Sequence, residues 1–94
     1  MSFVYVIGRM YGDFKSMGAP TKIGVSDNPW SRLRTIQTSC PFGIYIYHYY
    51  RFRSKEEAFD TERIVHKVLN KDRIQGEWFN VDPEEVYNLL QENL

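Results

Sequence analysis

The sequence contains a single cysteine, Cys40, among its 94 residues. One cysteine excludes an internal disulfide, and the lack of paired cysteines argues against a zinc ribbon. Such sparse cysteine usage fits a reducing cytoplasm, where we expect the protein to act. No apolar run approaches the roughly 18 residues of a membrane-spanning helix. The N-terminus also lacks a basic segment followed by an apolar stretch, so we expect neither a membrane span nor a secretory signal.

The net charge is zero, but the basic and acidic residues are unequally distributed along the chain. All 12 Lys and Arg residues lie in positions 1–73, where seven acids leave a net charge of +5. Positions 74–94 carry five acids and no base, a net charge of −5. A basic body with an acidic end is compatible with binding an anion on one face. The alternative is that the last segment is simply a solvated acidic helix.

The length of 94 residues predicts one domain, which we take to span residues 1–94. Periodicity and turn residues predict the order strand, strand, helix, strand, helix, strand, helix. The predicted strands are 3–9, 21–25, 43–53 and a short strand or turn at 76–81, the predicted helices are 29–37, 55–71 and 83–93, and residues 10–20 are predicted to form a loop. This order indicates an α/β or α+β fold, with a small mixed sheet of three to four strands flanked by helices.

Each predicted helix begins with a recognisable capping signal. Asn28 precedes Pro29, which suits the first helical position because its missing N–H costs nothing there. Ser54, followed three residues later by an acid, has the pattern of a capping box. Asp82 repeats this logic for the last helix.

The helix predicted at 55–71 places a carboxylate on its apolar face. With Ala58 at 0° and about 100° per residue, Leu69 lies near 20° and Glu62 near 40°. An inward carboxylate must be paired, hydrogen-bonded or metal-bound, because burying it alone costs several kcal/mol. Glu62 is therefore either a metal ligand or acid-base group in a cleft, or half of a structural ion pair. His66 follows one turn later, either contacting a phosphate or simply bonding Glu62.

The strand predicted at 43–53 is rich in tyrosine. Strict alternation places one set of side chains, Tyr45, Tyr47, Tyr49 and Arg51, on a single face. A tyrosine face beside an arginine is suited to stacking on nucleic acid. Tyrosine is also common in strands that pack under helices, so the same pattern has a purely structural interpretation.

The order of these residues resembles that of the GIY-YIG nuclease superfamily. Phe3-Val4-Tyr5 stands where that family has Gly-Ile-Tyr, and Lys22-Ile23-Gly24 stands where it has Tyr-Ile-Gly. Arg32 follows ten residues after Lys22, as the family's arginine does, and Glu62 falls at the place of its metal-binding glutamate. Lys-Ile-Gly, His66 and the Gly-Glu-Trp-Phe run at 76–79 are similar to a phage and bacterial branch of the family.

The resemblance implies a metal-dependent endonuclease that hydrolyses phosphodiester bonds in DNA. Tyr5 and Lys22 would activate a water molecule, with the Lys22 ammonium lowering the tyrosine pKa from its usual value of about 10. Arg32 would hold the phosphate with its planar donor fork. Glu62 would bind one Mg²⁺ or Mn²⁺ through a hard oxygen ligand, and His66 would join the same site.

Three further basic residues are candidates for contact with nucleic acid: Arg34, Arg51 and Lys67. Arg34 also rivals Arg32 for the phosphate-holding role, since rotation around that short helix does not separate them. The sequence has no clear counterpart of the family's late asparagine, for which Asn80 is the nearest candidate.

Lys22 in place of the second motif tyrosine leaves other functions open. The main alternative is a GIY-YIG-like module without catalysis that binds nucleic acid, a protein partner or a second copy of itself. A phage- or mobile-element-associated factor that acts on a host defence component is a third hypothesis, motivated by the branch resemblance alone.

Overall fold

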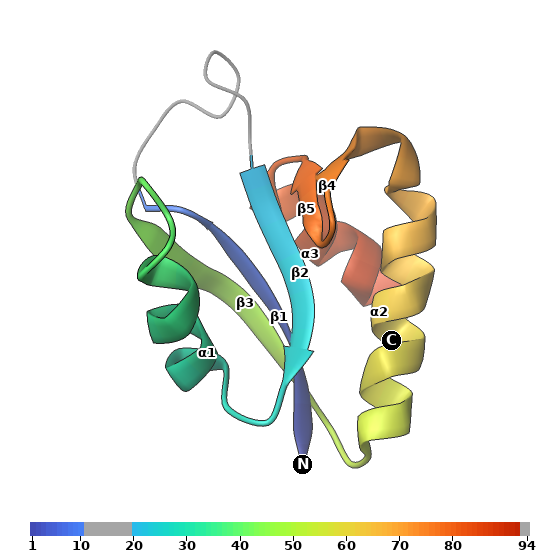
Figure 1. Cartoon of the computed structure of the whole chain (residues 1–94). Helices are drawn as coiled ribbons and strands as arrows, with labels where there is room; N and C mark the ends of the chain where they lie inside the picture. The colour runs from blue at the N-terminus through green and yellow to red at the C-terminus, as the bar shows by residue number, and fades with distance from the viewer. Residues whose placement is uncertain (11–19, 93–94) are drawn as a thin grey trace.

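The computed structural model shows a central sheet with helices on both faces (Figure 1). It describes residues 1–10 and 20–92, so most of the predicted 10–20 loop lies outside the described residues. The strands are β1 (Ser2–Arg9), β2 (Pro20–Ser26), β3 (Ile44–Phe52), β4 (Arg73–Gln75) and β5 (Trp78–Asn80), and the helices are α1 (Pro29–Gln37), α2 (Lys55–Val68) and α3 (Pro83–Glu92). The predicted α/β class is therefore confirmed. No helix in the described ranges is long and apolar enough to cross a membrane.

The sheet has the strand order β3-β1-β2-β5-β4, and every neighbouring pair is antiparallel. The prediction of a mixed sheet with three to four strands was therefore wrong, since five antiparallel strands lie within the described part of the chain. The missed strand is β4, whose three residues are all exposed and carry no buried alternation. The helix predicted to reach residue 71 ends at Val68, and a 3₁₀ turn leads into β4.

The predicted capping residues hold the helix starts. The Asn28 side chain accepts a hydrogen bond from the Ser31 N–H, with Pro29 as the first helical residue. The Ser54 hydroxyl accepts one from the Glu57 N–H at the start of α2. Asp82 accepts one from the Glu84 N–H before α3. Each contact satisfies a backbone donor that the helix leaves unpaired.

The two faces of β1 point into different cores. Val4 and Val6 pack with α2 and α3, in a cluster that includes Val65 and Leu90. Tyr5 and Ile7 point to the opposite face, where α1 contributes partly buried apolar side chains. Figure 1 shows the same division, with α1 on one side of the sheet and α2 with α3 on the other. The face covered by α1 is called the α1 face below.

A β-bulge in β3 changes which tyrosines share a face. Val6 pairs with His48 but Ile7 pairs with Ile46, so Tyr47 is an extra residue in the ladder. Ile46 consequently packs in the α1-face cluster, whereas Tyr50 packs in the cluster with α2 and α3.

The single tyrosine face predicted by strict alternation was therefore wrong. Tyr49 lies on the α1 face as the direct partner of Tyr5, and Arg51 is likewise the partner of Phe3. Tyr45 is instead the partner of Gly8, and the Tyr47 ring covers that glycine beside Pro83 on the opposite face. The bulge divides the tyrosines between the two faces, which a pattern of period two does not predict.

Candidate active site

Tyr5 is the buried centre of the predicted site. Its side chain is 1% exposed and points to the α1 face, where Arg32 is near enough to lower its pKa through its charge and donor groups. Gly24 lies directly across in β2, and a Cβ atom there would overlap the Tyr5 hydroxyl. The glycine of Lys-Ile-Gly therefore leaves the space that the tyrosine hydroxyl occupies.

The environment of Tyr5 keeps its hydroxyl protonated. Burial, reinforced by the negative charge of Glu77, raises the pKa of Tyr5 from 10.0 to about 12, against a smaller opposing effect of Arg32. The expectation that Lys22 lowers this pKa was wrong, because the Lys22 ammonium pairs with Glu77 instead. At neutral pH Tyr5 is therefore a hydrogen-bonding phenol and not a ready base.

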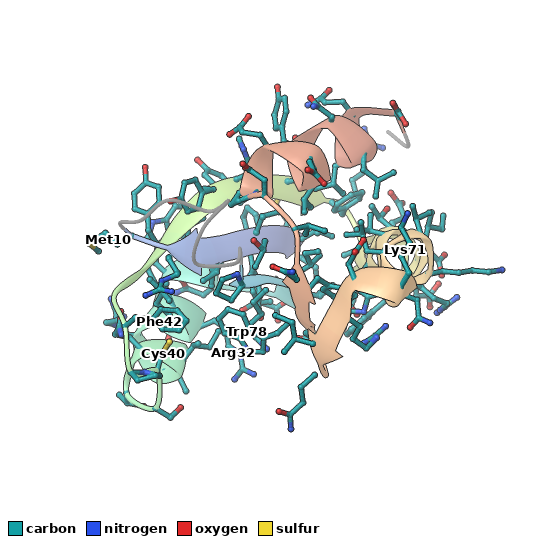
Figure 2. All side chains as sticks on the ribbon, turned by 90° about the horizontal axis from the view of Figure 1, so that it is seen from above. Met10, Arg32, Cys40, Phe42, Lys71 and Trp78 are labelled. Atoms are coloured by element: carbon teal, nitrogen blue, oxygen red, sulfur yellow. The ribbon has the colours of Figure 1, made fainter. Side chains whose placement is uncertain are left out.

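Lys22 is held by two partners on the β4–β5 hairpin. Its Nζ atom lies 3.1 Å from Glu77 Oε1 and 5.6 Å from the centroid of the Trp78 ring. The Lys22 side chain is only 12% exposed, so the ammonium is positioned between these groups. Figure 2 shows Trp78 on the same side of the sheet as Arg32.

Glu77 is a member of the site that the sequence reasoning missed. Gly76, with φ of 56°, forms the tight turn between β4 and β5, a conformation that favours glycine. Glu77 follows it, and its carbonyl accepts a hydrogen bond from the Ile23 N–H at 3.1 Å. The available signal was its place in the Gly-Glu-Trp-Phe run, but the run alone does not show that the hairpin tip meets β2.

Glu62 faces inward from α2, as the helical rotation predicts. Its side chain is 13% exposed, and its Oε2 atom is buried with no hydrogen-bond partner among the residues that the structure describes. Burial, together with the charge of Glu77, raises the pKa of Glu62 from 4.5 to about 7, while Lys22 opposes this shift. These mutual effects indicate that Glu62, Glu77 and Lys22 share one electrostatic environment.

His66 connects α2 to the same stretch of β2. Its Nε2 atom lies 2.8 Å from the Ile23 carbonyl oxygen. A carbonyl can only accept, so Nε2 carries the hydrogen, and Nδ1 lies 4.0 Å from Glu62 Oε1. The backbone of Ile23 thus binds the Glu77 carbonyl through its N–H and His66 through its oxygen. This residue fixes α2 and the hairpin tip on either side of one site.

The other predicted nucleic-acid contacts are divided between two places. Lys67 lines a hollow of about 410 Å³ together with Glu62 and His66, and with Phe59, Arg63 and Arg73. Arg34 and Arg51 are exposed on α1 and β3 and do not line this hollow. Of the two rival arginines, Arg32 is the one whose side chain acts on the pKa of Tyr5.

The oxygen donors of the site suit a hard cation. Mg²⁺ and Mn²⁺ prefer carboxylate oxygens, and Mg²⁺ commonly binds through one or two of them while keeping waters on its other positions. The unpartnered Glu62 Oε2 atom is such a donor. The described residues contain no group of three or more His, Cys, Asp or Glu side chains that could hold a metal. A metal here would therefore be held by Glu62, with other ligands supplied by water and substrate.

Comparison with known proteins gives one match. The T5orf172 domain family matches residues 2–93, almost the whole chain. This family is associated with phage and nuclease-like modules related to GIY-YIG domains, which is compatible with a nuclease-like or nucleic-acid-binding role. No curated protein and no solved structure matches the chain significantly. Because the match spans the sheet, its helices and the residues around Tyr5, the chain belongs to the T5orf172 domain family.

Proposed function

We propose that this protein is a metal-dependent endonuclease that hydrolyses phosphodiester bonds in DNA. The observation that carries the proposal is the convergence of Tyr5, Arg32, Glu62 and the Lys22–Glu77 pair around the middle of β2. They come from β1, α1, α2, β2 and the β4–β5 turn, so only the tertiary fold unites them. Hydrolysis of a phosphodiester needs positive charge, a metal-binding oxygen and a proton acceptor, and this set contains all three.

The cations of the site suit the binding and stabilisation of a phosphate. The exposed Arg32 side chain offers several N–H donors in a planar fork beside Tyr5. Lys22 supplies a point charge beside Glu77, whose carboxylate acts on Tyr5. As negative charge develops on the phosphate oxygens, both cations stabilise it without having to move into place.

Glu77 is the group best suited to accept the proton of the attacking water. It is 37% exposed and therefore open to a water molecule, whereas Tyr5 with its pKa of about 12 holds its own proton. In this assignment Tyr5 donates a hydrogen bond that orients the water or a phosphate oxygen. The water proton passes to the Glu77 carboxylate as the water oxygen attacks phosphorus and the bond to the leaving oxygen breaks.

Glu62 would hold the Mg²⁺ or Mn²⁺ ion through its unpartnered oxygen. When bound, such an ion would supply Lewis-acid stabilisation of the phosphate and of the leaving oxygen. Glu62 must be ionised to bind it, and the neighbouring Lys22 charge favours that form. His66, whose ring is fixed by the Ile23 carbonyl, lies beside this glutamate, with its Nδ1 atom 4.0 Å from Glu62 Oε1.

The proposal is tested by incubating the protein with single- and double-stranded DNA, with Mg²⁺, Mn²⁺ or EDTA. We expect metal-dependent cleavage that falls by roughly 10²–10³-fold in Glu62→Gln and Arg32→Gln, the usual effect of removing one group that stabilises the transition state. Glu85→Gln, an exposed acid on α3, serves as the matched control and should cleave normally. Absence of metal-dependent cleavage of any nucleic acid at high protein concentration would overturn the proposal.

A second candidate function is nucleic-acid binding without catalysis. Two observations favour it. Lys22, which stands in place of the motif tyrosine, is already paired with Glu77. The pKa of Tyr5 is raised, so its hydroxyl is a poor base. This function predicts salt-sensitive binding with no turnover, unaffected by Glu62→Gln. Binding together with robust metal-dependent cleavage would exclude it.

A further inference from the structure

Two aromatic side chains on the α1 face are packed together yet remain half exposed. Trp30 is 47% exposed and Tyr49 is 51% exposed, although their ring centroids lie 4.9 Å apart in an edge-to-face arrangement. Phe3 packs against the other side of Tyr49, with ring centroids 6.1 Å apart. This support holds the rings in place without burying them. Large apolar surfaces left exposed in this way commonly mark a binding site.

The local structure of two separate elements produces this pair. Trp30 lies in the first turn of α1, one turn before Leu33, which packs on the sheet. The β3 bulge at Tyr47 shifts the alternation, so that Tyr49 points toward Trp30 and not toward α3. Without the bulge, strict alternation would place Tyr49 and Tyr45 on the same face of the sheet. Bulges beside binding sites commonly re-aim a side chain in this way.

Two arginines lie near the two rings. Arg34 lies four residues after Trp30 on α1, so the two side chains are neighbours on the helix surface. Arg51 lies two residues after Tyr49 and shares its face of β3. Neither α1 nor β3 contains an Asp or Glu residue. Trp30, Arg34, Tyr49 and Arg51 together are called the aromatic platform.

We propose that the aromatic platform stacks the bases of unpaired nucleic acid, so that the substrate class is single-stranded or locally unpaired. Every base has a stacking face, which a duplex hides and a single strand exposes. Exposed rings with interleaved arginines, and no acid on either element, fit such a strand in both shape and charge.

The platform borders the site at Tyr5. Tyr49 is the direct cross-strand partner of Tyr5, a pairing in which Cβ atoms lie roughly 4.5–5.5 Å apart. A strand whose bases stack on Trp30 and Tyr49 therefore brings a neighbouring phosphate toward Arg32 and Tyr5. This last step rests on the proposed nuclease function, whereas base stacking itself does not.

The test measures binding in EDTA, so that cleavage cannot contribute. Fluorescently labelled single-stranded DNA and the corresponding duplex are titrated with wild type, Trp30→Ala, Trp30→Phe and Tyr49→Ala. Wild type is expected to bind the single strand more tightly than the duplex. Trp30→Ala and Tyr49→Ala should each weaken single-strand binding by about 5- to 100-fold, as expected for one lost base stack, with duplex binding little changed. Trp30→Phe should keep most of the affinity.

Tyr45→Ala is the matched control. Tyr45 is 51% exposed on the same strand as Tyr49, but it lies on the other face because of the bulge. We expect it to bind single strands like wild type. Equal affinity for single strand and duplex, an unchanged Trp30→Ala variant, or an equal loss in Tyr45→Ala would each overturn the proposal. So would a platform variant that loses only self-association, seen by sedimentation.

The outcomes separate this inference from the proposed nuclease. Cleavage that requires Glu62 but does not change in the Trp30 and Tyr49 variants would contradict base stacking on the platform and support the nuclease proposal. Single-strand binding that requires both rings, with no cleavage in Mg²⁺ or Mn²⁺, would support base stacking on the platform and contradict the nuclease proposal.

Discussion

At the scale of single residues, Glu62 shows a conflict between its proposed function and the stability of the fold. Within the described part of the chain its buried Oε2 atom has no hydrogen-bond partner, and its raised pKa means that the fold disfavours the ionised form. A structural glutamate at this position would be expected to have a paired carboxylate. The unsatisfied oxygen is therefore better explained by a ligand that arrives from outside the chain, such as a metal ion.

This conflict predicts that Glu62→Gln stabilises the protein at high pH. The folded pKa of about 7 lies above the ordinary value of 4.5, so the folded state binds more protons and wild-type stability falls as pH rises between these values. At pH 8 the neutral variant should be more stable by up to about 3 kcal/mol, a rise in Tm on the order of 10 °C. At pH 4 the two proteins should melt together. Thermal denaturation at both pH values measures this.

Glu56→Gln is the control, since Glu56 lies exposed on the same helix. Its melting temperature should change little at pH 8. Mg²⁺ or Mn²⁺ should raise the Tm of wild type but not of Glu62→Gln, because a ligand that binds only the folded state stabilises it. A Glu62→Gln variant that is less stable than wild type at pH 8 would show that the carboxylate has a structural partner.

Glu77→Gln is predicted to separate binding from turnover. The substitution removes a negative charge beside Lys22 and leaves the ammonium free for a phosphate. Nucleic-acid affinity should rise several-fold, because repulsion near the phosphate is lost. The maximal cleavage rate should fall by 10²-fold or more if Glu77 accepts the proton, within the typical range for a general base. Equilibrium binding and single-turnover cleavage measure the two effects.

The same substitution also tests the environment of Tyr5. The Glu77 charge raises the Tyr5 pKa, so its removal should bring the phenol titration below about 12, as followed by ultraviolet absorbance. Glu85→Gln, with its acid on α3, should leave affinity, rate and titration unchanged. A Glu77→Gln variant that cleaves at the wild-type rate would exclude Glu77 as the proton acceptor.

At the scale of elements, the local signals predicted more than the long-range ones. The caps Asn28, Ser54 and Asp82 act within three residues, so the sequence alone specifies where the helices begin. The inward direction of Glu62 likewise follows from one helix. The β3 bulge and the short strand β4 depend on pairing with strands elsewhere in the chain, so the periodicity of the local sequence does not predict them. Glu77 was missed for this reason, since its role depends on the hairpin reaching Ile23.

The β1–β2 pairing predicts a specific sensitivity at Gly24. A Cβ atom there would overlap the Tyr5 hydroxyl and lie 2.9 Å from Glu77 Oε1. Tyr5 is 1% exposed and cannot move aside easily. Gly24→Ala should therefore cost about 1–3 kcal/mol in stability, as overpacking does, and reduce cleavage more than the stability loss alone explains. Chemical denaturation and the DNA-cleavage assay measure the two effects.

Gly43→Ala is the matched control for this prediction. A Cβ atom at Gly43 would lie 3.5 Å from Met10 Cβ, an ordinary contact. This variant should keep wild-type stability to within about 0.5 kcal/mol and retain activity. If both alanine variants behave alike, the space at Gly24 is not what positions Tyr5.

At the scale of the whole molecule, the acids of α3 and the arginines of α1 and β3 lie on opposite faces of the sheet. The helices α3 and α2 lie on one face of the sheet and α1 lies on the other (Figure 1). Arg32 and Arg34 belong to α1, and Arg51 pairs with Phe3 on the α1 face. The net charge of zero thus conceals a dipolar surface. Such a surface attracts a polyanion to one side and orients it before contact.

This asymmetry predicts which charges control the salt dependence of binding. The logarithm of the affinity for single-stranded DNA falls with the logarithm of salt concentration, by about 0.7 for each phosphate neutralised. Arg32→Gln and Arg51→Gln should each lower this slope by about 0.7. The double variant Glu85→Gln with Glu92→Gln changes the net charge by +2 on α3 alone, and its slope should stay that of wild type because those acids do not face the strand. A slope that followed net charge, and not the face carrying it, would show that the DNA does not bind on the α1 side.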